Sequence, residues 1–149
     1  MEWNEYFLNI AANVALKSKD PNTKIGAVIV GLDNQIISTG FNGFPRGIAE
    51  YHTERWERPI KYRYVCHAER NAVDNAARSG VALKGSTLYL VGMGPPTVPC
   101  LECAKTVIQA GIVKVVGHAY KPAPDHWIDD FEFSLALLKE ACVKFQEIK

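Results

Sequence analysis

Apolar residues recur at helical intervals in four stretches of the chain. Residues 3–18 place apolar side chains, among them Phe7 and Ile10, on one face at a period of about 3.6 residues. This stretch stops before Pro21, because proline disfavours the helical conformation in the residue that precedes it. The same pattern predicts three further helices, over residues 68–78, 100–110 and 131–145.

Shorter runs of β-branched and apolar residues separate these helices. The runs 25–30 and 36–39 flank a turn-like tetrapeptide, so we predict that they pair as a hairpin. Two more strands are predicted over residues 87–91 and 113–117. Helices between the later strands favour a mixed sheet with parallel crossovers. We therefore expect an α/β fold, a three-layer α/β/α sandwich that residues 1–149 form as a single domain.

Residues 40–64 show neither the helical nor the strand pattern of apolar residues. The segment opens with glycines and a proline, in the sequence Gly40-Phe41-Asn42-Gly43-Phe44-Pro45-Arg46-Gly47, and continues with mixed charges and aromatic residues. A connection this long in a small domain usually has a function of its own.

Composition narrows the classes of partner. The net charge is +1, from 17 basic and 16 acidic side chains, so no general field would attract a long polyanion. A small substrate is therefore expected in preference to a nucleic acid. No apolar run approaches the roughly 20 residues of a membrane span, and the first residues lack a secretory pattern. We expect a soluble, cytoplasmic protein with no membrane partner.

Two short motifs stand at predicted helix starts. His-Ala-Glu occupies residues 67–69 and Pro-Cys-x-x-Cys occupies residues 99–103, with a strand between them. Helix N-termini gather at the carboxyl edge of such a sheet, where ligands bind, and they stabilise thiolates. The side chains of His67, Cys100 and Cys103 supply three ligands, which is the number in a catalytic zinc site that keeps its fourth position for water.

Each motif is weak by itself. A lone C-x-x-C is also typical of redox sites and of half a structural zinc site, and H-x-E is common on helix surfaces. Together and in this order, with Cys100 33 positions after His67, they match the signature of zinc-dependent nucleobase deaminases. Cys66 and Cys142 are expected to pack, the latter in an apolar helical stripe, and no second zinc site is expected. Further possible ligands are His52, His118 and His126.

Glu69 is predicted to be a general acid and base. Side chains two positions apart on a helix point about 200° away from each other, so Glu69 is not expected to share the metal with His67. In the first turn it can still lean over the open position. Zinc lowers the pKa of bound water to about 7, which supplies hydroxide for attack on C4 of a cytosine ring. Glu69 would carry the proton to ring N3 and then to the departing amino group.

Longer stretches resemble the deoxycytidylate deaminases of the cytidine deaminase superfamily. The resemblance rests on residues 18–27 (SKDPNTKIGA), the loop 40–47, the block 61–72 (KYRYVCHAERNA) and residues 99–104 (PCLECA). It implies a cytidine-deaminase-like fold, one catalytic Zn²⁺, and hydrolysis of deoxycytidine monophosphate (dCMP) to deoxyuridine monophosphate (dUMP) and ammonia, a precursor for thymidylate synthesis.

The resemblance also implies substrate contacts. Asn42 would bind the deoxyribose 3′-hydroxyl, although it could instead merely tolerate a left-handed turn, and Ala68 would form the pocket floor. The 5′-phosphate would lie near the polar residues Asn22, Lys24, Tyr120 and Lys121. Where relatives often carry arginine, Lys121 lacks the bidentate fork, and both lysines could instead be ordinary solvated side chains.

Regulated members of this group imply an oligomer, a hexamer, that dCTP with Mg²⁺ activates and dTTP inhibits. The allosteric residues would be Gly40, Gly43, Arg46 and Gly47, whose N–H groups and guanidinium suit phosphate. Alternatively, the loop only shapes the substrate pocket and the enzyme is unregulated.

Three other functions stay open at this point. A deaminase that edits tRNA shares the zinc motifs but needs a basic surface. A binding module with a structural zinc would have no use for Glu69. Another free cytosine nucleotide or nucleoside, such as dCTP or cytidine, could be the preferred substrate.

Overall fold

Five strands form one mixed sheet in the computed structural model, which describes all 149 residues. They are β1 (Gly26–Val30), β2 (Ile36–Phe41), β3 (Thr87–Gly94), β4 (Lys114–Pro122) and β5 (Lys144–Glu147). Their order across the sheet is β2-β1-β3-β4-β5. β1 runs antiparallel to both neighbours, whereas β3, β4 and β5 are parallel to one another. The predicted hairpin and the mixed sheet are confirmed.

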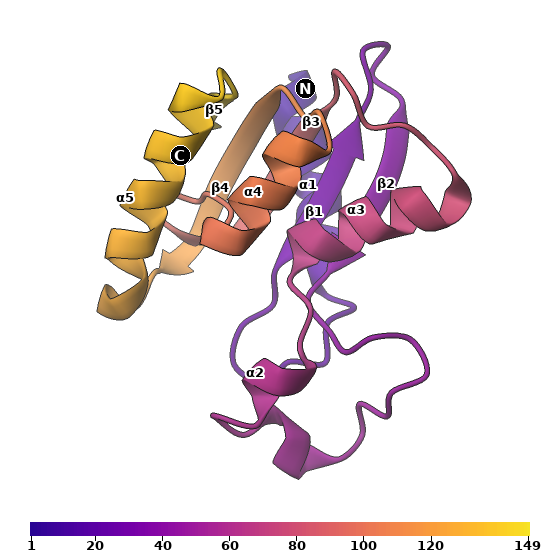
Figure 1. Cartoon of the computed structure of the whole chain (residues 1–149), viewed down its shortest axis with the longest axis vertical. Helices are drawn as coiled ribbons and strands as arrows, with labels where there is room; N and C mark the ends of the chain where they lie inside the picture. The colour runs from indigo at the N-terminus through magenta and orange to yellow at the C-terminus, as the bar shows by residue number, and fades with distance from the viewer.

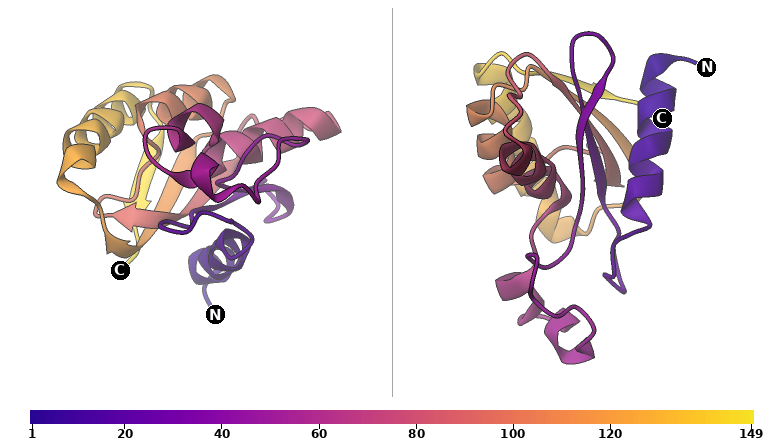
Figure 2. Two further views of the ribbon diagram at one scale, coloured as in Figure 1. Left: turned by 90° about the horizontal axis from the view of Figure 1, so that it is seen from below. Right: turned by 90° about the vertical axis from the view of Figure 1, so that its right-hand side faces the viewer.

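Helices cover both faces of this sheet. The helices that cover it are α1 (Trp3–Ala15), α3 (Ala68–Ser79), α4 (Leu101–Gln109) and α5 (Asp125–Glu140), whereas α2 (Lys61–Tyr64) and a short 3-10 helix before it, η1 (Thr53–Trp56), lie away from the sheet. α1 lies on one face, and α3, α4 and α5 lie on the other (Figure 1, Figure 2). The expected three-layer α/β/α arrangement is confirmed. None of these helices combines the length and apolar character that crossing a membrane requires.

Alternate residues of β1 face the two helical layers. Ala27 and Ile29 belong to the core cluster that includes buried residues of α3, α4 and α5. Val28 and Val30 belong to the second cluster, which includes the buried face of α1. All five β1 residues are buried, as expected for a central strand that is covered on both sides.

The C-terminal region differs from the sequence prediction. The helix predicted over 131–145 is wrong at both ends, because α5 begins at Asp125 and stops at Glu140, and β5 follows it. Apolar residues continue at suitable spacing through Val143 and Phe145, with no glycine or proline to mark the end of the helix. Cys142 is exposed in the intervening turn, with a φ of 59°, so its predicted packing in a helical stripe is also wrong.

Residues 42–67 form a smaller lobe beside the sheet, which we call the α2 lobe (Figure 1). The sequence predicted no element here, yet η1 and α2 both form. Stacked aromatic rings hold this lobe together: Phe44 lies 4.2 Å from Trp56 and 5.1 Å from Tyr64, measured between ring centroids. Such a cluster requires no regular period in the sequence.

One edge of the sheet carries both helix starts that bear the sequence motifs. β2, β3 and β4 end at this edge, and β1 begins there, with Gly26 paired to Phe41 and Val91. α3 starts directly after His67 and α4 directly after Cys100. The topology therefore brings segments that lie 33 positions apart in the chain to the same place.

Candidate functional site

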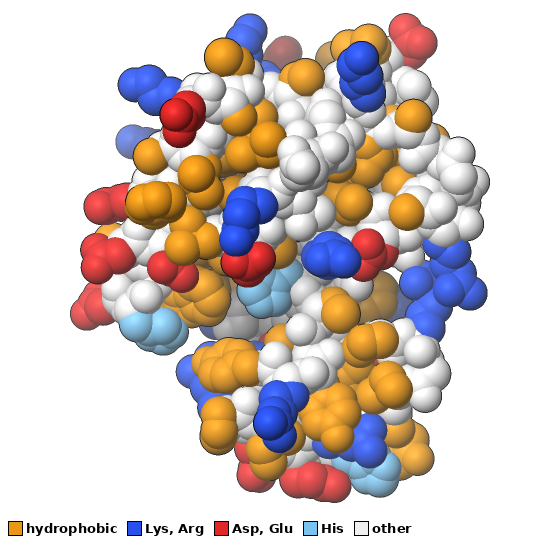
Figure 3. Space-filling model, in the orientation of Figure 1, with side chains coloured by type: hydrophobic (Ala, Val, Ile, Leu, Met, Phe, Trp, Pro, Cys, Tyr) orange, Lys and Arg blue, Asp and Glu red, His pale blue; other side chains and the backbone are white.

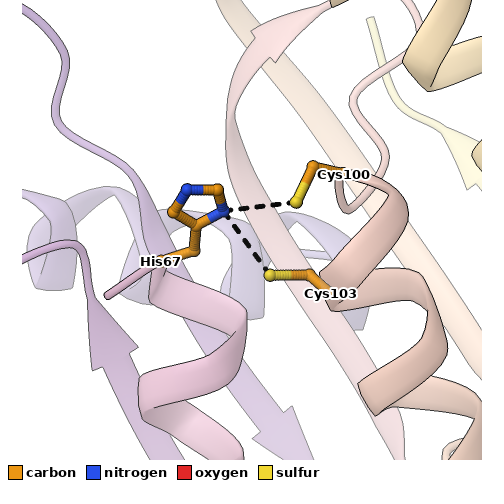
Figure 4. Close-up of side chains that lie close together, drawn as sticks. All are labelled: His67, Cys100 and Cys103. Atoms are coloured by element: carbon orange, nitrogen blue, oxygen red, sulfur yellow. Dashed lines mark hydrogen bonds between the residues drawn. The ribbon is translucent and has the colours of Figure 1, made fainter. Parts of the chain in front are cut away.

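The three predicted metal ligands meet at these two helix starts. His67 and Cys100 are the N-cap residues of α3 and α4, and Cys103 lies in the first turn of α4. His67 Nδ1 is 3.3 Å from Cys100 Sγ and 3.6 Å from Cys103 Sγ (Figure 4). All three donor atoms lie within 4.8 Å of one another.

These distances suit a zinc ion. Tetrahedral bonds of about 2.0–2.1 Å to nitrogen and about 2.3 Å to sulfur put the two kinds of donor roughly 3.6 Å apart. No fourth histidine, cysteine or carboxylate joins the group, so one coordination position is available for water. His118 contacts the Ile148 carbonyl through Nδ1, and His52 lies beside Glu54.

The three side chains shift one another's pKa values. Hydrogen bonds from Cys103 and from His67 lower the pKa of Cys100 to about 4. Its hydrogen bond with Cys100 raises the pKa of His67 to about 9, and the interaction of Cys103 with Cys100 raises the pKa of the Cys103 thiol. The lowered pKa of Cys100 favours its thiolate form, which His67 Nδ1 contacts at 3.3 Å. This thiolate is the group most ready to bind a cation.

Glu69 lies beside this group in the first turn of α3. It is only 6% exposed, and burial raises the pKa of its carboxyl above the ordinary value. A carboxyl group whose pKa is raised holds a proton more readily and is therefore suited to taking up and returning one. Glu69 also lines a cavity at this edge of the sheet.

A cavity of about 720 Å³ opens at this edge of the sheet. The surface is hollowed between the sheet-bearing body and the α2 lobe (Figure 3). His67, Glu69 and Cys100 line the cavity, and so do Asn42 and Ala68. Its volume falls in the range of sites for small organic ligands, roughly 300–1,000 Å³.

Asn42 is buried and its amide orientation is fixed. Its Nδ2 donates to Thr23 O at 2.8 Å and to Asp20 Oδ2 at 3.2 Å, while its Oδ1 accepts from Ile25 N at 2.8 Å. Both amide protons are therefore used, and only the second lone pair of Oδ1 is free to meet a ligand. Asn42 does not have a positive φ, so the alternative that it merely tolerates a left-handed turn is wrong.

The predicted phosphate residues divide into two groups. Asn22 and Lys121 line the cavity, and Lys121 Nζ donates to Thr23 Oγ1 at 2.7 Å and to Asn22 O at 3.0 Å. Lys24 and Tyr120 are not among the lining residues. The Lys24 ammonium donates to Ser18 O, and the Tyr120 hydroxyl accepts from Lys24 N.

The four residues predicted to bind an allosteric effector lie in different local environments. Gly40 lies in β2, where a Cβ atom would come within 2.3 Å of Ala68 O, so this position allows close packing of α3. Gly43 pairs with Cys66 in an isolated bridge. Arg46 is exposed and donates to Asn75 Oδ1 at 2.7 Å, and Gly47 has a φ of +86°.

The chain is similar to known deaminases over most of its length. The family described as the cytidine and deoxycytidylate deaminase zinc-binding region matches residues 1–119. The chain belongs to this family. It is 42% identical over 122 residues to deoxycytidylate deaminase from Homo sapiens and 41% identical over 121 residues to that from Pongo abelii. Each alignment covers 78% of this chain and 64% of the relative, so the chain spans just under two thirds of these curated relatives.

A solved member of the deaminase family has a similar structure. The dCMP deaminase of cyanophage S-TIM5, in complex with dCMP and dUMP, matches with a TM-score of 0.75 and 26% sequence identity. The match covers 97% of this chain and 95% of the phage chain.

Sequence reasoning missed several cavity residues. Asp20 and Lys61 form a buried ion pair, with 2.6 Å between Oδ2 and Nζ, and both line the cavity. Trp127 and Phe131, which stack on one another in α5, also line it. Lys61 had the appearance of a surface residue in a charged segment, and only the α2 lobe brings it to Asp20. The one available signal was its place in the block of residues 61–72 that resembles the family.

Proposed function

We propose that this chain catalyses the zinc-dependent hydrolytic deamination of dCMP to dUMP and ammonia. The observation that carries the proposal is the placement of His67, Cys100 and the Glu69 carboxylate in the lining of one cavity. Family membership supports the reaction type, and the dCMP and dUMP bound to the phage relative support the substrate class.

Glu69 acts as the general acid and base in this reaction. Zinc held by His67, Cys100 and Cys103 would supply Lewis-acid activation of water near neutral pH. Glu69 accepts a proton from the attacking water and passes it to ring N3 while the C4–O bond forms. It then takes the second proton from the added hydroxyl and gives it to the 4-amino group. The C4–N bond breaks and ammonia leaves.

Asn42 recognises the sugar. Because only an Oδ1 lone pair is free, its ligand partner has to be a hydrogen-bond donor, and the deoxyribose 3′-hydroxyl is one. Arg58 and Lys121 are cations in the cavity lining that suit the 5′-phosphate, together with Asn22.

A sugar analogue separates recognition from structural damage at Asn42. We expect wild-type protein to lose about 1–3 kcal/mol in kcat/KM on the 3′-deoxy analogue of dCMP, because the Oδ1 acceptor is left without its donor. Asn42→Ala should discriminate little between the two nucleotides. Equal discrimination by both proteins would contradict the assignment, whatever the loss of activity on dCMP.

A substrate panel tests the activity itself. Cytidine, deoxycytidine, dCMP and dCTP are offered to zinc-loaded protein, and ammonia and the uracil product are both quantified. The expected result is the highest kcat/KM for dCMP, with equal amounts of dUMP and ammonia. A clear preference for the nucleoside or the triphosphate would overturn the substrate, and no turnover of any member would overturn the reaction.

Regulation and assembly are also proposed from the resemblance. A homohexamer activated by dCTP with Mg²⁺ and inhibited by dTTP would place an effector phosphate near the exposed Arg46 and Gly47, whose φ is positive. Substrate-saturation curves with and without each triphosphate test the effectors, and light scattering tests the assembly. If neither triphosphate changes the curves of the wild type, and Arg46→Ala gives the same curves, the proposed regulation is contradicted. The deaminase proposal would still stand.

A further inference from the structure

The loop that carries Cys100 is tied to the C-terminal strand. Glu147 on β5 accepts two hydrogen bonds from Thr97: the backbone N–H donates to Oε2 at 2.8 Å, and the hydroxyl donates to Oε1 at 3.1 Å. Thr97 precedes Cys100 by three residues and is only 1% exposed. Both hydrogen-bond donors of this buried residue are therefore satisfied by one carboxylate.

The other side of Thr97 is confined by β4. Gly117 pairs with Glu147 across the parallel strands, and a Cβ at Gly117 would come within 2.1 Å of Thr97 O. The absence of a side chain at Gly117 lets the loop lie directly on the sheet. The carboxylate and the glycine together restrict the Thr97 backbone to one position.

A second attachment lies one residue before the ligand. Ser134 on α5 is completely buried, and its hydroxyl donates to Pro99 O at 2.5 Å. Pro99 O belongs to the peptide that joins Pro99 to Cys100, so this bond orients the peptide from which the thiolate projects. The start of α4 is thus held from α5 as well as from β5.

We infer that Glu147 and Ser134 are positioning residues for the metal centre, which hold residues 97–99 so that the Cys100 sulfur faces His67. The inference rests on the proposed function for the role of Cys100 as a ligand. Both residues lie outside residues 1–119, the part that the family's zinc-binding region matches. The C-terminal region therefore contributes to the site although no ligand comes from it.

Partners that orient a metal ligand act on metal affinity, because a mobile ligand has to be ordered before it binds. Removal of such partners typically lowers metal affinity about 10–100-fold. Glu147→Leu removes both acceptors and Ser134→Ala removes the single donor. Glu147→Gln should rescue the site, because its amide can accept from Thr97 N and donate to the Thr97 hydroxyl.

Zinc release to a chelator, measured without substrate, tests this inference. We expect Glu147→Leu and Ser134→Ala to bind zinc about 10–100-fold more weakly than wild type. Glu147→Gln should stay close to wild type. Glu132→Leu, on an exposed glutamate of α5, is the matched control and should not differ from wild type.

The visible spectrum of the cobalt-substituted proteins separates positioning from general loss of stability. Glu147→Leu and Ser134→Ala should shift the cobalt bands, while Glu147→Gln and the control should not. If Glu147→Leu does not fold, Ser134→Ala carries the test alone. Folded variants with wild-type zinc affinity and cobalt spectra would overturn the inference. Because no readout uses a nucleotide, failure of dCMP turnover would leave this result standing and would count only against the proposed function.

Discussion

Protonation is the residue-scale property that governs zinc uptake by the His67–Cys100–Cys103 group. At pH 7 the metal-free group holds Cys100 as a thiolate, with a pKa of about 4, and His67 as an imidazolium, with a pKa of about 9. The raised pKa of Cys103 keeps its thiol protonated. Zinc needs a neutral imidazole and two thiolates, so binding at pH 7 should release about two protons per ion.

Because zinc binding releases protons, zinc affinity should depend on pH. Zinc affinity should weaken as the pH is lowered from about 9, because His67 and Cys103 hold their protons more firmly against the metal. Calorimetry in buffers of different ionisation enthalpy measures the released protons directly. Release of none at pH 7 would show that the ligands are not protonated as described.

The buried pair Asp20–Lys61 supports the second residue-scale prediction. Their side chains are 1% and 8% exposed, and Asp20 Oδ1 also accepts from the backbone N–H groups of Asn22 and Thr23. Lys61→Met leaves the Asp20 carboxylate buried without its counter-charge, which typically costs about 3–5 kcal/mol of unfolding free energy. Denaturant unfolding measures this loss.

An exposed ion pair on α4 provides the control. Lys105 and Glu102 are 57% and 84% exposed, so Lys105→Met should change the unfolding free energy by less than about 1 kcal/mol. Similar losses in the two variants would mean that the buried Asp20–Lys61 pair contributes no more to stability than the exposed pair.

At the scale of elements, the fit of α3 against β2 determines where His67 and Glu69 lie. A Cβ at Gly40 would come within 2.3 Å of Ala68 O and 2.4 Å of Ala72 N, which are backbone atoms that cannot turn aside. Gly40→Ala should therefore push α3 outward, destabilise the fold by about 1–3 kcal/mol and reduce turnover.

Gly43→Ala, three residues further along the chain and just after β2, is the matched substitution. Its Cβ would come close only to the carboxylate of Glu50, at 3.1 Å, which can move, and would make ordinary van der Waals contact with the Phe41 ring at 3.7 Å. We expect a smaller loss of stability than for Gly40→Ala, measured by the same thermal unfolding experiment. A milder effect at Gly40 than at Gly43 would show that α3 does not depend on the missing side chain.

Elements with a clear period could be predicted from sequence, and those without one could not. The hairpin, the helix after His67 and the helix after Cys100 follow from apolar spacing and stop signals. β5 was missed because Val143 and Phe145 continue the apparent helical pattern. The α2 lobe was missed because contacts between aromatic rings distant in sequence, not periodicity, hold it together.

Some residues of the candidate site could likewise be predicted from the sequence, and others could not. His67, Glu69 and Cys100 carry a signal because their chemistry requires particular residue types at helix starts. The chemistry of Asp20, Lys61 and Glu147 gives no such signal, because a charged residue in a buried ion pair or hydrogen bond and an exposed one look alike in a sequence. Their partners lie 41 and 50 positions away and become neighbours only in the folded chain.

At the scale of the whole molecule, three separate parts of the chain meet at one cavity. The edge of the sheet supplies the two helix starts, the α2 lobe supplies Lys61 and Arg58, and α5 supplies Trp127 and Phe131. A cavity enclosed in this way suits a single nucleotide, and the proposed chemistry takes place where His67, Glu69 and Cys100 line it.

Turnover of dCMP by wild-type protein and by Glu69→Gln protein of equal zinc content is the most direct test of that chemistry. Glutamine has a similar size but cannot carry a proton, so the variant should keep its zinc and its fold. Its kcat should fall by at least about 10²- to 10⁴-fold. A zinc-loaded Glu69→Gln protein that forms dUMP at a rate close to wild type would contradict the proposed role of Glu69 and the mechanism built on it.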